Sequence, residues 1–212
     1  MIYLIGAGGH GKVVLEGLWA SGVTVQLLDG DAGLEGKRIL GCVVDREERA
    51  LAALLVPVRF VVGIGDGGSR QRVVERWEER GHRLARVVHP SAIISPSAMI
   101  EEGAVILSGA VVQTEARIGK GAIVNSAASV DHDCRVGAFA HVAPGARLAG
   151  GVELGELAWV GIGACVRETV VIGARTVIGA GSVVVDDLPK DVVAYGNPCR
   201  VVRQIGRGEE KR

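Results

Sequence analysis

The stretch AVILSGAVVQTEARIGKGAIVNSAASV, residues 104–130, repeats a six-residue pattern. An aliphatic residue returns at every sixth position, as at Ile106 and Val112, and a small residue stands four places later, as at Ala110. The aliphatic register continues without a gap through residues 88–189. A repeat of this period predicts a parallel β-helix, in which each hexad forms one short strand and one corner.

The spacing within each hexad predicts which side chains face the core. The small residue and the next aliphatic residue are two positions apart, so both point inward and the residue between them points outward. Three hexads make one triangular coil, which stacks residues 18 apart at about 4.8 Å. The 102 residues from 88 to 189 then form between five and six coils. An apolar stripe faces outward on this prism and predicts contact with another subunit: Val105, Val111, Ile123 and Trp159.

Strands and helices alternate in the first 87 residues. IYLI (2–5) reads as a buried strand, followed by a glycine turn and a helix to about residue 20. VTVQLL (23–28) and VRFVVGIG (58–65) read as further strands, and SRQRVVERWEERG (69–81) as an amphipathic helix. This alternation predicts a small parallel sheet of the Rossmann type.

The glycine turn LIGAGGHGK (4–12) matches the G-x-G-x-x-G fingerprint of dinucleotide-binding folds. It is not a complete P-loop, because Val13 stands where that motif needs the hydroxyl that binds magnesium. A full dinucleotide fold needs two mononucleotide halves, and this region has room for little more than one. We therefore expect a diphosphate or nucleotide held by backbone N–H groups at a helix N-terminus. The alternative is a turn that only packs the strand on the helix.

Composition excludes several classes of partner. Lys and Arg number 24 and Asp and Glu also number 24, so no charge excess favours nucleic acid or an anionic membrane. No segment approaches the roughly 18 apolar residues of a membrane span. The four cysteines are far apart and form no C-x-x-C pair, which predicts free thiols in a cytoplasmic protein with neither a metal site nor disulfides.

Unusual residues gather within the repeat in DHDCRVGAFAH (131–141). His132 falls at a corner and His141 faces outward, and one coil later they meet Gly150 and Trp159. Two histidines, a glycine and an aromatic ring on adjacent coils beside two acidic residues predict a catalytic site. An imidazole serves as a general base when an acid on its other nitrogen fixes its tautomer.

Four motifs together resemble a known family: GAGGHGK (6–12), LLDGD (27–31), GIGDGGSR (63–70), and HPSAIISPSA (89–98) leading into the hexads. The chain is similar to sialic acid O-acetyltransferases and UDP-amino-sugar N-acetyltransferases, which are hexapeptide-repeat left-handed β-helix acyltransferases. The resemblance implies a homotrimer with active sites between subunits. It also implies three regions: a nucleotide-sugar-binding Rossmann-like subdomain (1–87), a left-handed β-helix acyltransferase domain (88–189), and a C-terminal cap and tail (190–212).

The resemblance assigns His132 as the base and Asp133 as the acid that orients it, with Asp131 as an alternative. A backbone N–H at Gly150 suits the developing oxyanion, since no Cβ intervenes. Cys134 occupies an inward position, so transfer is expected to be direct. The expected substrate contacts are Gly8, His10, Asp29, Asp66 and Asn125. The expected contacts to acetyl-CoA are His141, Gly150, Trp159, Gly161, Ile162, Gly179 and Ala180.

The ending YGNPCRVVRQI (195–205) resembles the ending common to hexapeptide acyltransferases. It either lies near the CoA nucleotide or covers the last open coil. Residues 206–212 read as a solvated tail.

The leading hypothesis is therefore an acetyl-CoA-dependent N-acetyltransferase acting on a UDP-linked amino sugar, of the kind used in bacterial glycan synthesis. One alternative is O-acetylation of sialic acid or another sugar. A further alternative is a noncatalytic β-helix scaffold that binds a nucleotide sugar. Acetylation of serine is disfavoured, because it leaves the glycine-rich N-terminal region unused.

Overall fold

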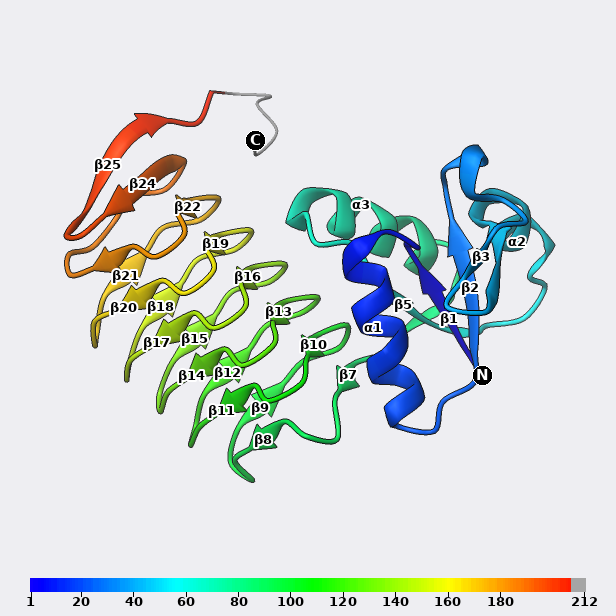
Figure 1. The fold of residues 1–212 in the computed structure, drawn as a ribbon, viewed down its shortest axis with the longest axis horizontal. Helices are drawn as coiled ribbons and strands as arrows, with labels where there is room; N and C mark the ends of the chain where they lie inside the picture. Colours follow the sequence, from blue (N-terminus) through cyan, green and yellow to red (C-terminus); the bar gives the residue numbers. More distant parts are fainter. Residues whose placement is uncertain (207–212) are drawn as a thin grey trace.

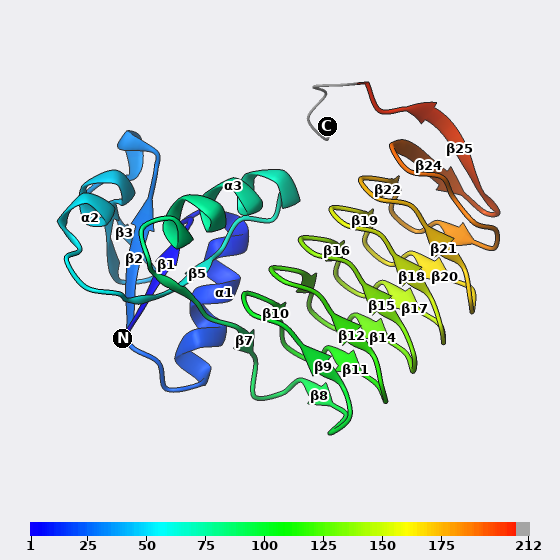
Figure 2. The same cartoon turned by 180° about the vertical axis from the view of Figure 1, so that it is seen from behind.

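The computed structural model describes residues 1–206, which form two parts that pack side by side. An α/β domain begins the chain, and a prism of stacked coils follows it (Figure 1). The same arrangement seen from behind places α1 and α3 between the small sheet and the prism (Figure 2). Helix α2 lies on the far side of the α/β domain from the prism in both views.

The α/β domain is built on one six-stranded sheet in the order β3-β4-β2-β1-β5-β6, with β3 antiparallel to β4 and the rest parallel. Its strands are β1 (Ile2–Ile5), β2 (Val25–Asp29), β3 (Arg38–Ile39), β4 (Cys42–Arg46), β5 (Arg59–Val62) and β6 (Arg83–Leu84). Its helices are α1 (Gly9–Ala20), the 3₁₀ helix η1 (Ala32–Leu34), α2 (Glu47–Ala53) and α3 (Gly67–Glu78).

The predicted strands and helices of this domain are confirmed as β1, α1, β2, β5 and α3. The sequence analysis did not foresee β3, β4, α2 and β6. Their segments are short or carry Arg, Glu and Gly among the apolar residues, so their periodicity is weak.

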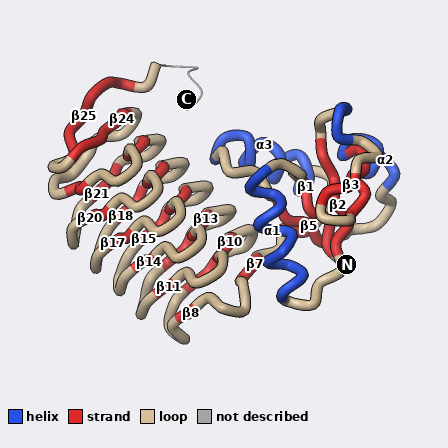
Figure 3. The backbone as a smooth tube through the Cα atoms, viewed as in Figure 1, coloured by secondary structure: helices blue, strands red, loops and turns tan. Residues whose placement is uncertain are grey.

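The prism has three walls of two-residue strands joined by tight corners (Figure 3). The first wall contains β7 (Val87–Val88), β10 (Val105–Ile106), β13 (Ile123–Val124), β16 (His141–Val142), β19 (Trp159–Val160) and β22 (Val177–Ile178). The second contains β8 (Ile93–Ile94), β11 (Val111–Val112), β14 (Ser129–Val130), β17 (Arg147–Leu148), β20 (Cys165–Val166) and β23 (Val183–Val184). The third contains β9 (Met99–Ile100), β12 (Arg117–Ile118), β15 (Arg135–Val136), β18 (Glu153–Leu154) and β21 (Val171–Ile172).

The strand register confirms the 18-residue coil. Val105 pairs with Ile123, and Ile123 pairs with His141, each in parallel. The inward positions of the hexads form one buried core that runs along the prism, and its small residues such as Ala110 and Cys134 are 0% exposed. The period of six therefore defines both the fold and the core.

The outer face of the first wall is covered by the α/β domain. Val105 and Ile123 are 0% exposed and belong to the same apolar cluster as Leu15 and Leu18 of α1. This corrects one expectation from the sequence: Val105 and Ile123 lie against the chain's own first helix. The repeat predicts that a residue faces outward from the β-helix, but it does not predict which neighbour covers that residue.

The top of the prism is covered by two longer strands. β24 (Val192–Gly196) pairs in parallel with β22, and β25 (Cys199–Gln204) pairs antiparallel with β24. The tail expected at residues 206–212 lies outside the described residues, apart from Gly206. Within residues 1–206, no helix is long and apolar enough to cross a membrane.

Candidate active site

His132 lies in the turn between β14 and β15, at the corner of the second and third walls. Its Nδ1 lies 2.7 Å from Oδ2 of Asp133, and both side chains are exposed. Asp133 holds a left-handed backbone conformation (φ 59°), which aspartate adopts more readily than most residues. Asp131 instead accepts the backbone N–H of His132 at 2.7 Å. Of the two acids left open by the sequence, Asp133 is therefore the one that contacts the ring.

The hydrogen bond to Asp133 sets the chemistry of the imidazole. Nδ1–H donates to the carboxylate, so Nε2 of the neutral ring is left as the proton acceptor. The same hydrogen bond is the main cause that raises the pKa of His132 above its ordinary value, with smaller contributions from the charges of Asp131 and Asp133. A base with this tautomer and a raised pKa is suited to accept a proton near neutral pH.

Gly150 lies directly against the His132 ring. A Cβ at this position would stand 2.5 Å from both Cε1 and Nε2 of His132, so only glycine leaves the ring in place. The amide of Gly150 donates to no group among the described residues. A donor without a partner beside Nε2 fits a site in which negative charge develops on a substrate oxygen.

We expect Asp133→Asn to move the acidic limb of the pH profile of kcat/KM to lower pH. The limb reports protonation of His132: below its raised pKa the ring carries a proton and accepts none. Removal of the carboxylate takes away the main cause of the raised pKa. A series of kcat/KM measurements against pH tests this, with Asp131→Asn as the matched control that shifts the limb less. An unmoved limb in Asp133→Asn would contradict the assignment.

His141 lies apart from His132 within one chain. It belongs to β16 on the outer face of the first wall, whereas His132 is at the opposite corner of the prism. His141 is 3% exposed and its ring lies 4.1 Å from that of Trp159, centroid to centroid. The prediction that His132 and His141 lie on adjacent coils is confirmed. The two histidines nevertheless do not share one site in a single chain.

Both ring nitrogens of His141 have partners within the chain. Nδ1 lies 3.2 Å from the carbonyl of Gly65 and Nε2 lies 2.9 Å from Nδ2 of Asn125. These partners fix the tautomer with hydrogen on Nδ1. His141 and Asn125 thus join the prism to the loop after β5, and in this arrangement neither nitrogen of His141 is free for a pantetheine chain.

A cavity of about 450 Å³ opens at the carboxyl edge of the small sheet, between β1 and β5. This is the point where the strand order reverses, which is where open α/β sheets bind their ligands. The cavity is lined by Gly6, Gly8, Gly9 and His10 at the start of α1, by Asp29, Gly30 and Glu47, and by residues 63–65. The backbone N–H groups at the start of α1 suit a diphosphate.

Three predicted substrate residues line this cavity. Gly8 is the N-cap of α1, and a Cβ there would meet no atom within 4 Å. Burial lowers the pKa of His10 to about 4, and the charge of Arg70 contributes further, so its ring is neutral. The buried Nε2 of His10 has no hydrogen-bond partner among the described residues. Asp29 receives the backbone N–H groups of Ala7 and Asp31 at 2.7 and 2.8 Å, so it holds the glycine turn.

Asp66 does not line the cavity. It is the N-cap of α3, where its side chain accepts the backbone N–H of Ser69 at 2.7 Å. The aspartate in GIGDGGSR therefore starts a helix, which the capping preference of aspartate explains.

The residues expected to bind acetyl-CoA occupy three places, of which the first is the outer face of the first wall, with His141 and Trp159. Gly150 lies beside His132, whereas Gly161, Ile162, Gly179 and Ala180 lie in turns between the first and second walls. Gly161 is required by packing, because a Cβ there would stand 2.6 Å from the carbonyl of Ile178. Ile162 is 58% exposed at the same corner. Within residues 1–206, no three His, Cys, Asp or Glu side chains are arranged to hold a metal ion.

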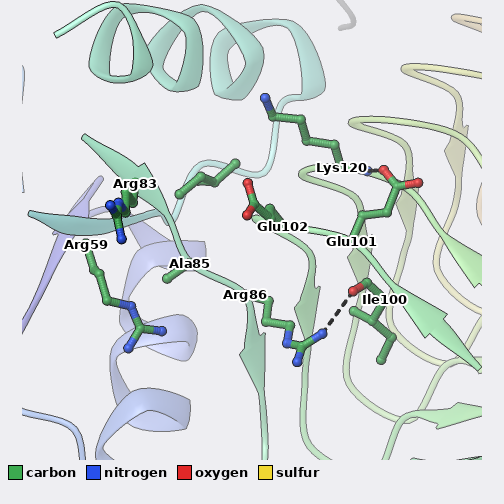
Figure 4. A pocket seen from close by; sticks show the side chains of 9 residues that line it. Arg59, Arg83, Ala85, Arg86, Ile100, Glu101, Glu102 and Lys120 are labelled. Atoms are coloured by element: carbon green, nitrogen blue, oxygen red, sulfur yellow. Dashed lines mark hydrogen bonds between the residues drawn. The ribbon is translucent and has the colours of Figure 1, made fainter. Parts of the chain in front are cut away.

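A larger cavity, of about 700 Å³, contains none of the predicted site residues. It lies between the small sheet and the first coil, with Arg59, Arg83 and Arg86 on one wall and Glu101 and Glu102 on the other (Figure 4). All five of these charged residues are exposed. Size alone therefore does not identify the site in this molecule.

Two buried charged residues near the smaller cavity were missed by the sequence analysis. Arg70 is 1% exposed and donates to the carbonyls of Gly65, Gly121 and Phe139, at 2.8, 2.7 and 2.7 Å. Glu47 is 4% exposed and lines the cavity. Each lies in a charged stretch that reads as a solvated helix face, so the sequence carries no signal for either.

Comparison with known proteins gives consistent results. Residues 1–77 match the family model of the PglD N-terminal domain. The chain is 41% identical to a variant of perosamine N-acetyltransferase from Caulobacter crescentus, solved with CoA and GDP-perosamine; the match covers 96% of this chain and 97% of that one, with a TM-score of 0.89. It is 38% identical to the acetyltransferase domain of PglB from Neisseria gonorrhoeae, solved with acetyl coenzyme A, over 95% of this chain and 98% of that one, with a TM-score of 0.90.

This chain belongs to the hexapeptide-repeat acyltransferase family of those proteins. It is an acetyltransferase, and its prism is the left-handed parallel β-helix of that family. Family membership sets aside the noncatalytic scaffold. A third structure, WeeI from Acinetobacter baumannii, is 25% identical over 95% of this chain and 99% of that one, with a TM-score of 0.87. No curated protein is significantly similar to the chain.

Proposed function

We propose that this protein is an acetyl-CoA-dependent N-acetyltransferase that acts on the amine of a nucleotide-linked amino sugar. The observation that carries the proposal is the arrangement of three groups at one corner. Asp133 holds Nδ1–H of His132, and Gly150, whose amide donates to no group among the described residues, lies against the Nε2 side of the ring. The relatives solved with CoA, with GDP-perosamine or with acetyl coenzyme A support this acyl donor and this class of acceptor.

The chemical step follows from these groups. The sugar amine attacks the thioester carbonyl, and Nε2 of His132 takes the proton that the amine loses. The N–H of Gly150 donates to the oxyanion that forms on the former carbonyl oxygen. The C–S bond then breaks, the CoA thiolate takes the proton from the His132 imidazolium and leaves as the thiol, and the neutral imidazole is restored. Asp133 stabilises the imidazolium in the meantime.

The nucleotide-sugar would bind in the cavity at the start of α1. Gly8 and His10, which line this cavity, would contact the diphosphate and the sugar, and Asp29 keeps the glycine turn in shape. The uridine nucleotide of the leading hypothesis came from the family resemblance and not from the residues of this chain, and no group in the cavity supports that base over another. Asp66 and Asn125 would act indirectly, through the start of α3 and through His141. A cytoplasmic location, where acetyl-CoA is available, stays a prediction.

The site is incomplete in one chain, which argues for a homotrimer. His132 lies between the second and third walls, whereas Ile162 and Ala180 lie between the first and second. One prism cannot bring two of its own corners together. A three-fold arrangement sets a corner of one prism against a corner of the next, which would close an acetyl-CoA groove between subunits.

We expect mixed oligomers of His132→Ala and Ile162→Arg to be active although each variant alone is inactive. Random mixing would place an intact His132 opposite an intact Ile162 corner at about a quarter of the sites. Ile162 is exposed, so the arginine disturbs the groove without entering the core. Co-expression with different affinity tags, followed by an activity assay, tests this. A fully active particle of 22.0 kDa in light scattering would contradict the trimer.

The function itself is tested by thiol release from acetyl-CoA. The acceptors are amino sugars linked to GDP and to UDP, and free sialic acid as the hydroxyl acceptor. Acetylation of a nucleotide-linked amine with no turnover of sialic acid is the expected result. Turnover of sialic acid alone would move the proposal to O-acetylation.

A further inference from the structure

Glu47 is a buried carboxylate at one end of the nucleotide cavity. It is the first residue of α2 and is 4% exposed. Its Oε1 accepts the indole N–H of Trp77 at 2.9 Å and a guanidinium N–H of Arg76 at 2.5 Å. Its Oε2 accepts from no group among the described residues. Glu47 lines the cavity together with Gly30. A Cβ at Gly30 would stand 3.5 Å from this oxygen.

The carboxylate of Glu47 is buried on the side of Oε1, whereas Oε2 is not among the buried atoms without a partner and is open to the cavity. The desolvation of a charge is costly unless it is paired and hydrogen-bonded. Arg76 supplies the charge and, with Trp77, satisfies one oxygen only. The remaining oxygen therefore fits a hydrogen-bond donor that arrives with the ligand.

The cavity has two distinct ends, which fixes the direction of the ligand. Gly65 lies at the end next to the β-helix, where a Cβ would stand 3.9 Å from Cε1 of His141. Glu47 starts α2, on the side of the domain away from the β-helix (Figures 1 and 2). The sugar amine has to leave the cavity toward a β-helix to be acetylated. The diphosphate then lies at the start of α1, and the nucleoside lies at the end that holds Asp29 and Glu47.

The free oxygen of Glu47 discriminates between bases. A carboxylate only accepts hydrogen bonds. Guanine presents two neighbouring donors, N1–H and the exocyclic amino group, to which one carboxylate oxygen with two lone pairs is complementary. Uracil presents a single N–H between two carbonyl oxygens, and those oxygens repel a buried carboxylate. Asp29 competes poorly for this role, because its two oxygens already receive backbone N–H groups.

We infer that Glu47 is the specificity-determining residue of the nucleotide cavity and that it selects a guanine over a uracil nucleotide. The inference rests on the proposed function, since it takes the cavity to be the nucleotide-sugar site. It replaces the uridine nucleotide that the family resemblance suggested.

The test is titration calorimetry of the full chain with GDP and with UDP. The unmodified protein is expected to bind GDP at least about 10-fold more tightly than UDP, the scale of one charge-assisted hydrogen bond. Glu47→Gln keeps the length and one acceptor for Trp77 but places an amide donor opposite guanine N–H. We expect this variant to bind GDP roughly 10–100-fold more weakly, while UDP changes less than about 3-fold. The neighbouring exposed Glu48→Gln is the matched control and should alter neither affinity.

Each outcome separates this inference from the proposed function. Equal losses for GDP and UDP in Glu47→Gln would show a contact to ribose or a purely structural role, and would overturn the inference alone. UDP preferred by the unmodified protein would overturn it as well. Should Glu47→Gln fail to fold, Glu47→Asp keeps the charge and withdraws the carboxylate from the base, and weaker binding of GDP with unchanged binding of UDP is again the expected result.

Gly8→Val tests the site itself. Its side chain enters open space in the cavity, so both nucleotides should bind at least about 10-fold more weakly while acetyl-CoA is barely affected. Unmodified protein that binds neither nucleotide, or Gly8→Val that loses only acetyl-CoA, would overturn the proposed function and with it the role of Glu47.

Discussion

His132→Ala is expected to lower kcat/KM for acetyl transfer by about 100-fold or more, the usual scale for loss of a general base. The physical reason is the geometry at the corner. Asp133 fixes hydrogen on Nδ1, so Nε2 is the basic atom, and it lies against Gly150. Without the imidazole the amine has no positioned acceptor for its proton, while the amide of Gly150 remains in place.

The loss should come without unfolding, because the side chain of His132 is 61% exposed and packs into no core. His89→Ala is the matched control, since His89 lies on the first coil, away from His132, and its Nδ1 is hydrogen-bonded to Ser91. Steady-state kinetics and a thermal melt of each variant provide the measurement. A fully active His132→Ala enzyme would remove this residue from the mechanism.

Arg70→Met is expected to lower the free energy of unfolding by about 3 kcal/mol or more, the cost of leaving two buried acceptors unpaired. The guanidinium is 1% exposed and reaches carbonyl groups of both parts of the molecule. Burial lowers the pKa of Arg70 to about 10. This value is still well above 7, so the guanidinium is charged at pH 7. Methionine fills a similar volume but donates nothing to Ile64, Gly121 or Phe139.

Arg72→Met on the exposed face of the same helix is the matched control, for which a change within about 0.5 kcal/mol is expected. Urea denaturation followed by tryptophan fluorescence suits the measurement, because Trp77 is buried in α3. The loop after β5 carries Ile64 and Gly65, so nucleotide affinity should fall as well. An unchanged urea midpoint for Arg70→Met would show that the two parts are held together by their apolar contact alone.

The β-helix could be predicted from sequence because its information is local and repeated. Each hexad specifies its own strand and corner, and residues 18 apart then stack whatever the rest of the chain does. The same locality explains the pair of His132 and Asp133. Adjacent residues at one corner are close in any coil of this kind, so their contact needs no distant element.

The glycine turn was predictable for a similar reason. Gly8 stands between a buried strand and a helix within nine residues, and it lies at the helix start in the structure. Asp29 lies at the end of β2, as expected, but its oxygens bind the backbone of Ala7 and Asp31. Position along a strand predicts where a side chain is, and its hydrogen-bond partner depends on the loops that fold over it.

Two features were decided by tertiary structure alone. Ile123 and His141 face outward from the coil, as the repeat predicts. Only the packing of the α/β domain shows that both are buried. Arg70 and Glu47 lie in charged stretches of sequence, and only the folded chain places Arg70 among carbonyl groups and Glu47 beside the cavity.

The repeat by itself thus determined the β-helix and the corner that carries the base, because both depend on contacts at fixed short spacing. The burial of the first wall depends on which surfaces of the α/β domain and the prism meet, through contacts between residues as far apart as Arg70 and Phe139. The environment of Glu47 depends on how α2 packs against α3 within the α/β domain. The sequence has no period for either kind of contact.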